Sequence, residues 1–221
     1  MMALHVDYAA QRAFSRIIAG LRSARLDAEL SQNALATGLP VRGRAVSEWE
    51  TGAIEPTLGH LIQWSWELGR RLVIVGRDGE LRYGPVRQRP GELWEAFERR
   101  RLAVPLRNRR LALGMAQGEL GELVGVSRDS IQRWELVRVP PRPIAHVVWA
   151  QKLGYSLDTR PVADGGPRLR RVGSAGLALP GLSGQIGQQG QPGLTGQAER
   201  SASGPGSPAG ELRAAADGRR G

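Results

Sequence analysis

Residues 116–135 read AQGELGELVGVSRDSIQRWE, and this stretch predicts two short helices joined by a tight turn. Leu120 and Leu123 are three positions apart, so we expect both on the inward side of the first helix. Gly125 can adopt the left-handed backbone conformation of a tight turn, and Ser127 is a residue type that caps helix N-termini. The pattern therefore divides the stretch at residues 125–127.

The second half of this stretch predicts a helix with one buried side and one polar side. Ile131 and Trp134 are three positions apart and define the buried side. The outward side chains are then Arg128, Asp129, Gln132 and Arg133. Arginine can bond to guanine O6 and N7, glutamine to adenine N6 and N7, and aspartate can accept from cytosine N4. These side chains have the chemistry needed to read base edges.

A similar pattern occurs earlier in the chain. A shift of 85 positions superposes residues 21–50 on residues 106–135 without a gap. The matching pairs include Leu21/Leu106, Arg25/Arg110, Gln32/Gln117, Leu35/Leu120, Trp49/Trp134, Glu50/Glu135, Trp64/Trp149 and Gly69/Gly154. Two tryptophan pairs at one offset predict an internal duplication. Trp66 and Trp94 have no such counterpart, and either could lie at an interface.

We therefore expect a mainly α protein with two helical bundles in tandem. Residues 8–83 form the first, called repeat 1, and residues 92–172 form the second, called repeat 2, with a linker at residues 84–91. Residues 173–221 lack aromatic residues and are rich in Gly, Gln, Ser, Pro and Ala, which predicts a disordered tail. Glycines recur there at every third position, as in collagen, but the six triplets are too few for a triple helix.

Each bundle is expected to end in a short β-hairpin. Residues 72–83 predict two strands around an Asp78-Gly79 turn. Residues 156–172 predict a weaker hairpin, which Pro161 would confine to a sheet edge. Thr57 is expected to cap a helix that ends at Gly69, and Pro105 is expected to break or restart a helix.

The pattern Gln-x-x-Leu-(Ala/Gly)-x-x-x-Gly-Val-Ser-x-x-x-Ile-x-x-Trp-Glu resembles the helix-turn-helix proteins of the lambda repressor and Cro family, also called the xenobiotic-response-element (XRE) type. The resemblance covers residues 17–75 and 102–160. It implies five-helix bundles that bind operator DNA, with the second helix of the motif in the major groove. Repeat 1 departs from the pattern, because Pro40 and Arg42 replace the turn glycine and the serine cap, so its turn is expected to be remodelled.

The resemblance also assigns roles to particular residues. The base-reading positions are Arg128, Asp129, Gln132 and Arg133 in repeat 2, and Gly43, Arg44 and Ser47 in repeat 1. The resemblance assigns Gln32 and Gln117 to phosphate contact or support. Ser127 supports the motif as a cap. The remaining candidates for phosphate contact lie on or near the first helix of each repeat: Arg22, Arg25, Arg107 and Arg110. For the arginines a solvated helix face is the alternative interpretation.

Charge and composition agree with a polyanion partner. The net charge is +10, and residues 1–172 carry 27 basic and 18 acidic side chains. Basic side chains release the counterions condensed on phosphates, which favours binding to nucleic acid. The chain has no Cys, its three His are scattered, and it shows no nucleophile–base pair or phosphate-binding loop, so we expect no metal, no cofactor and no enzymatic activity. It has no long apolar run, which indicates no membrane partner and a cytoplasmic location.

Sequence-specific binding of double-stranded DNA, as a repressor-type regulator from a bacterium, phage or plasmid, is the inferred function. The alternative is a protein-interaction module such as an antitoxin, in which DNA binding is secondary and the hairpin edges bind a partner. The sequence leaves a homodimer or a complex with a partner protein open.

Overall fold

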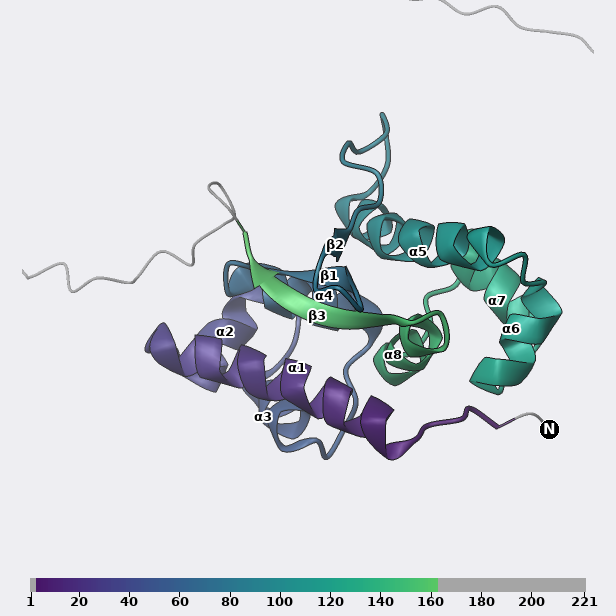
Figure 1. Ribbon diagram of the computed structural model, residues 1–221. Helices are drawn as coiled ribbons and strands as arrows, with labels where there is room; N and C mark the ends of the chain where they lie inside the picture. The colour runs from purple at the N-terminus through teal and green to yellow at the C-terminus, as the bar shows by residue number, and fades with distance from the viewer. Residues whose placement is uncertain (1–2, 163–221) are drawn as a thin grey trace, which may run out of the picture. The chain divides into compact units, whose positions relative to one another are not determined.

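Helices dominate the chain, as the sequence predicts. The computed structural model describes residues 3–162, so the expected tail and the last strand expected in repeat 2, residues 168–172, lie outside the described residues. Repeat 1 contains α1 (Tyr8–Asp27), α2 (Gln32–Gly38), α3 (Gly43–Thr51), α4 (Leu58–Glu67), β1 (Arg70–Gly76) and β2 (Leu81–Arg82). Repeat 2 contains α5 (Trp94–Ala112), α6 (Gln117–Val124), α7 (Arg128–Glu135), α8 (Pro143–Lys152) and β3 (Tyr155–Pro161). Figure 1 shows these elements around the strands.

The two repeats place their elements at the same spacing. The helices α2, α3 and α4 begin 85 residues before α6, α7 and α8, and β1 begins 85 residues before β3. Local signals explain several boundaries. Thr57 caps α4 by accepting a hydrogen bond from the His60 amide, and Gly69 follows the helix with φ 66°, as predicted.

The strands form one sheet, in the order β2-β1-β3. The pairing of β1 with β2 confirms the hairpin expected around Asp78-Gly79. In repeat 2 the expectation of a separate hairpin missed the main contact, because β3 pairs along its whole length with β1 of repeat 1. Strand β1 is apolar after its first two residues, and its free edge accepts β3. Residues 72–76 of β1 are buried, whereas in β3 only Leu157 and Thr159 are. Pro161 lies at the end of an edge strand, as expected.

The register of β1 and β3 relates the two repeats by a local two-fold axis. The strands are antiparallel, Arg70 pairs with Pro161, and Gly76 pairs with Tyr155. At the centre, Val73 pairs with Asp158, its own counterpart 85 residues later. Antiparallel pairing about two equivalent residues is the isologous contact that a two-fold axis produces.

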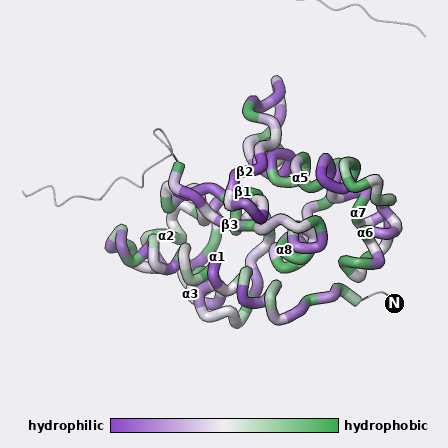
Figure 2. The backbone as a smooth tube through the Cα atoms, viewed as in Figure 1, coloured by the Kyte–Doolittle hydropathy of each residue, from purple (hydrophilic) through white to green (hydrophobic). Residues whose placement is uncertain are grey.

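The first helix of each repeat crosses over to the other repeat. Helix α1 packs against α8 and β3, and α5 packs against α4 and β1. The two repeats share one hydrophobic core. Helix α8 lies at the centre of this core, and Figure 2 shows that it is largely hydrophobic. The tryptophans that recur in both repeats are all buried: Trp49, Trp64, Trp134 and Trp149. Trp66 and Trp94 contact each other between α4 and α5, with ring centroids 5.2 Å apart, so both lie where the repeats meet.

Two expectations about local structure are wrong. Pro105 does not break its helix, because α5 continues through it to Ala112. Leu102, Pro105 and Leu106 are buried together, and this packing offsets the missing backbone hydrogen bond. Leu123 does not face inward: its side chain is 45% exposed, and Val124, four positions after Leu120, occupies the buried side. No helix among residues 3–162 is long and apolar enough to span a bilayer.

Left-handed backbone positions also match between the repeats. Gly52 ends α3 with φ 75°, and its counterpart Val137 adopts φ 59° without the freedom of glycine. Glu29, with φ 56°, corresponds to Gly114, with φ 64°. In each pair one repeat carries a residue that is strained by about 1 kcal/mol or more in this conformation.

We expect Glu29→Gly to stabilise the protein by about 1 kcal/mol, because glycine adopts this conformation without steric cost. Glu29 is exposed, so the change removes no buried contact. Gly114→Ala is the matched control and should destabilise by a similar amount. Denaturant unfolding of both variants measures the difference, and a Glu29→Gly variant less stable than the parent would contradict the prediction.

Candidate nucleic-acid interface

The helix-turn-helix of repeat 2 has the geometry predicted from its sequence. Helix α6 ends at Gly125, which has φ 84° and donates its amide to the Gly121 carbonyl. Ser127 caps α7 by accepting a hydrogen bond from the Ser130 amide at 3.2 Å. A Cβ atom at Gly121 would lie 2.6 Å from the Val126 carbonyl oxygen, so only glycine permits the turn to pack so closely on α6.

The outward face of α7 carries the predicted reading residues. Ile131 and Trp134 are buried, which turns the opposite side of the helix to solvent. Arg128, Asp129, Gln132 and Arg133 are all exposed. Within residues 3–162, Arg128, Asp129 and Arg133 form no ion pair, so their side chains are available to a ligand.

A buried ion pair holds α7 in place. Arg110 on α5 donates two hydrogen bonds to the Glu135 carboxylate, of 2.6 and 2.9 Å, and one to the Met115 carbonyl of 2.7 Å. Gln117 on α6 donates to the same carboxylate at 2.8 Å. Since these residues come from α5, α6 and α7, the network fixes the position of α7 relative to the other two helices. The hydrogen bond that Arg110 donates to Glu135 raises the pKa of Arg110, although burial opposes this.

Repeat 1 contains the same network. Arg25 donates to Glu50 at 2.6 and 2.9 Å and to the Leu30 carbonyl at 2.6 Å, and Gln32 donates to Glu50 at 2.9 Å. Burial raises the pKa of Glu50, but hydrogen bonds from Arg25 and Gln32 and the charges of Arg25 and Arg22 outweigh it, so the pKa is lowered. The network of repeat 1 thus keeps the Glu50 carboxylate charged.

The structure separates the predicted phosphate-contacting or supporting residues into two groups. Arg22 and Arg107 are exposed on α1 and α5, where they can reach a partner. Arg25 and Arg110 are buried, and Gln32 and Gln117 bind the buried carboxylates, so these four support the motif from inside. Sequence reasoning did not assign a role to Glu50 and Glu135. The signal was present, because both carboxylates directly follow a core tryptophan in each repeat.

The reading helix of repeat 1 is built differently, as Pro40 and Arg42 suggest. Helix α2 ends one residue earlier than α6, with Leu39 extended at φ −110°, and Arg42 provides no side-chain cap for α3. Gly43 packs against Asn33, whose Oδ1 would lie 1.8 Å from a Cβ at position 43. The turn is therefore remodelled around Asn33.

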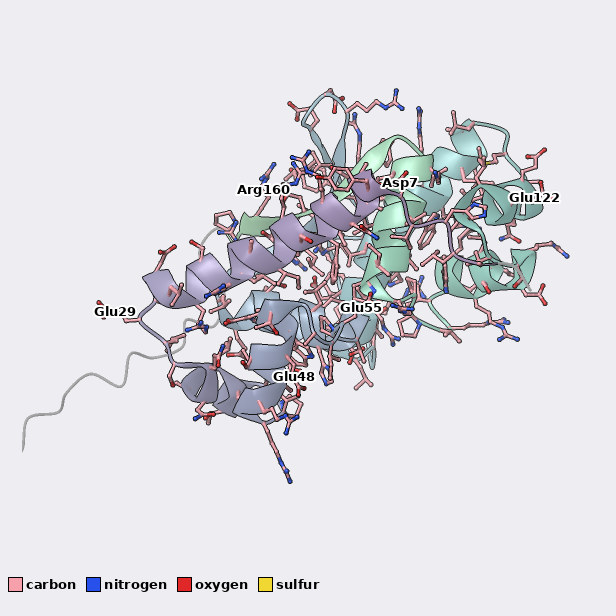
Figure 3. The ribbon with its side chains drawn as sticks, turned by 90° about the horizontal axis from the view of Figure 1, so that it is seen from below. Asp7, Glu29, Glu48, Glu55, Glu122 and Arg160 are labelled. Carbon is pink, nitrogen blue, oxygen red and sulfur yellow. The ribbon has the colours of Figure 1, made fainter. Side chains whose placement is uncertain are left out.

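The exposed charges of α3 also differ from those of α7. Arg44 pairs with Glu48 at 2.7 Å, and Ser47 is half-buried. The Glu48 side chain, labelled in Figure 3, is partly exposed. Its counterpart in repeat 2 is Arg133. The outward face of α3 is therefore neutral where that of α7 is positive.

The segment before α1 contacts the turn of repeat 2. The His5 amide donates to the Val124 carbonyl at 2.9 Å, and a Cβ at Gly125 would lie 2.1 Å from the Ala3 carbonyl oxygen. This contact links repeat 1 to the helix-turn-helix of repeat 2, and the sequence pattern did not indicate it. Among residues 3–162, no cluster of three or more His, Asp or Glu side chains could hold a metal ion.

Comparisons with known proteins found one match, which lies in the second repeat. Residues 106–159 match the family model described as "Helix-turn-helix", of the XRE type. No curated protein and no solved structure matches the chain significantly. The matched range begins in α5, contains α6 and α7, and ends in β3. Residues 106–159 are therefore similar to DNA-binding helix-turn-helix domains.

Proposed function

We propose that the chain binds double-stranded DNA sequence-specifically as a repressor-type transcription regulator, with α7 as its main reading helix. The observation that carries this proposal is the exposed polar face of α7 on a rigidly held helix. Its capped N-terminus, the buried Arg110–Glu135 pair and the family match all support it. Helix α3 of repeat 1 then adds contacts and affinity, because a tethered second site meets DNA at a high local concentration.

Substitutions of the proposed base-reading side chains should distinguish the role of α7 from that of α3. Replacing Arg128 and Gln132 together with alanine should lower the preference for a selected site over a scrambled duplex by about 10- to 100-fold, because a bidentate base contact discriminates by ~1–3 kcal/mol. Replacing Arg44 and Ser47 should lower affinity with less loss of preference. Gel-shift titrations at equal salt measure both. The opposite ranking would reverse the assignment, and no complex at low salt would contradict DNA binding itself.

We also propose that the two repeats read inverted half-sites. The pairing of Val73 with Asp158 places a two-fold axis between the repeats, and duplex DNA has matching two-fold symmetry in its backbone. Because α3 and α7 present different side chains, the two half-sites differ in sequence. A single chain would therefore read an imperfect inverted repeat.

The expected result of selection from random duplexes is an inverted arrangement. Reversing one half-site within the selected sequence should weaken binding roughly tenfold or more, since several base contacts are lost at once. The control is a duplex in which the whole site is inverted, so that the two half-sites keep their arrangement relative to each other. This duplex should bind as tightly as the selected one. Equal binding to direct and inverted arrangements would contradict the two-fold model of recognition.

The second candidate function is protein interaction. Strand β3 is an edge strand, and among the described residues only β1 pairs with it. Such an edge can add a strand from a partner, as an antitoxin does with its toxin. Substitutions in α7 distinguish the two functions, because they should impair DNA binding and leave pairing at β3 unchanged.

A further inference from the structure

A cavity of about 880 Å³ opens between α1, the end of α3 and the start of α8. Its volume lies in the range of small-molecule sites. Its walls are mainly apolar and include Phe14, Ile18, Leu26, Trp49, Ile54 and Ile144. Residues of both repeats contribute, because Ile144 belongs to α8 and the others belong to repeat 1.

Two arginines and two glutamates line the cavity, and Arg22 is the one of these four without an ion pair within residues 3–162. Glu50 is neutralised by Arg25, and Glu55 is paired with Arg142 while it also accepts the Ile144 amide at 2.8 Å. Arg22 lines the same cavity and forms no ion pair within residues 3–162. An apolar space with one spare cation favours a ligand with an apolar body and an anionic group.

The equivalent place in repeat 2 is closed. There the space is only about 10 Å³ and is lined by Trp134, Val137, Val139 and Pro140, among others. Gly52 and Glu55 of the open cavity correspond to Val137 and Pro140, whose side chains occupy that space. The open cavity is therefore a feature of one repeat and does not follow from the fold that both share.

The position of the cavity connects it with the reading helix of repeat 1. Residues 49–52, at the end of α3, form one wall. Glu55, labelled in Figure 3, joins this wall to Arg142 at the start of α8 through their ion pair. A ligand in the cavity would contact both repeats at their junction.

We propose that this cavity binds a small amphipathic anion, with an aromatic or aliphatic body against Phe14, Ile18 and Trp49 and its anionic group at Arg22. Binding there adjusts how the two repeats meet and so changes the affinity for DNA. This second part rests on the proposed function, and the first part does not.

Two fluorescent probes of the same shape test the site in the full chain. 1-Anilinonaphthalene-8-sulfonate is anionic, and N-phenyl-1-naphthylamine is its neutral analogue. Both should bind saturably at one site per chain. Arg22→Gln should weaken the anionic probe about three- to tenfold and leave the neutral probe unchanged, as expected for one partly exposed charge contact. The matched control is Arg107→Gln, the equivalent change in repeat 2, which should alter neither.

A variant that fills the cavity provides a second test of whether the probes bind there. Ser15→Trp should abolish saturable binding of both probes while the melting temperature stays within a few degrees, because Ser15 lines the cavity from an exposed position on α1. Ala19→Phe serves if Ser15→Trp does not fold. Absence of saturable binding in the parent chain, or binding that both filling variants leave intact, would overturn the proposal.

The link to DNA is measured separately. Saturating the cavity with the anionic probe should change the Kd for the selected duplex at least threefold in the parent chain and leave it unchanged in Ser15→Trp. An unchanged Kd with the probe bound would overturn the coupling. A chain that binds no DNA would contradict the proposed function and the coupling together, while fluorescence would still decide whether the cavity binds the anion.

Discussion

Replacing Glu135 with alanine should destabilise the protein by about 3–5 kcal/mol, which is the usual cost of breaking a buried ion pair from one side. Arg110 is only 6% exposed, and without Glu135 its guanidinium keeps a single bond, to the Met115 carbonyl. Gln117 loses its acceptor in the same variant. The unpaired buried charge dominates the effect, because its desolvation is no longer compensated.

The equivalent substitution, Glu50→Ala, should cost a similar amount, since Arg25 and Gln32 make the same bonds in repeat 1. Glu122→Ala is the control, because Glu122 is exposed on α6 and should change stability by less than about 0.5 kcal/mol. Urea unfolding measures all three variants. If Glu135→Ala lay within 1 kcal/mol of the parent, the buried pair would not hold the motif together.

A double substitution distinguishes the loss of attraction from the cost of an unpaired charge. Arg110→Met combined with Glu135→Leu removes both charges and keeps the volume similar. Apolar replacements of whole buried pairs are often neutral or stabilising, so the double variant should be more stable than Glu135→Ala alone. Its DNA affinity would then show how far the exact placement of α7 depends on the network.

Much of the fold could be predicted because its signals are local. The caps at Thr57 and Ser127, the turn at Gly125 and the tryptophan positions depend on neighbours within a few residues. The pairing of β1 with β3 depends on residues about 85 positions apart, and the sequence of neither strand specifies which strand it pairs with. Pattern reasoning therefore predicted the helices and missed the shared sheet, and with it the two-fold relation.

In the candidate site, too, features that depend on local sequence could be predicted, and features that depend on distant residues could not. A helical pattern places Arg128 and Gln132 on the outward side, and they are exposed. For Arg25 and Arg110, their place on the first helix of each repeat suggested a phosphate contact or a solvated face, while the structure buries them against Glu50 and Glu135. The side of a helix on which a long charged residue lies depends on what packs there, and a carboxylate 25 positions later decides it in both repeats.

Acidification should destabilise the protein through His146, which lies on α8 and is 1% exposed. Neither ring nitrogen has a hydrogen-bond partner among the described residues, and the ring packs on Trp149 with centroids 5.3 Å apart. Burial lowers the pKa of His146 to about 4, so the folded protein holds this ring neutral. The unfolded chain binds a proton there below pH ~6.5.

The direction of the change in stability follows from which state binds the proton at His146. Above pH ~6.5 neither state is protonated at His146, and its contribution to stability is complete. As the pH falls from ~6.5 towards 4, only the unfolded state gains the proton, so stability falls by ~1.4 kcal/mol per pH unit, or ~3 kcal/mol in all. The lowered pKa values of Glu50 and Glu92 add their own losses of stability only below 4.5. Burial raises the pKa of Glu67, so this group gains a proton first in the folded state and opposes the loss above pH 4.5. The difference in slope between the parent and a variant without His146 therefore isolates the contribution of His146.

His146→Leu should remove this slope, and it introduces the residue that repeat 1 carries at the equivalent position, Leu61, which is itself fully buried. Because leucine leaves no buried polar atom unbonded, the variant should also be more stable at neutral pH by about 1–3 kcal/mol. Unfolding free energies at pH 7.0, 6.0 and 5.0 compare the parent, His146→Leu and the control His60→Gln, whose position on α4 is partly exposed. Since the control keeps His146, it should retain the parent slope. A parent protein equally stable at pH 7.0 and 5.0, or a His146→Leu variant with the same slope as the parent, would show that His146 does not carry the pH dependence.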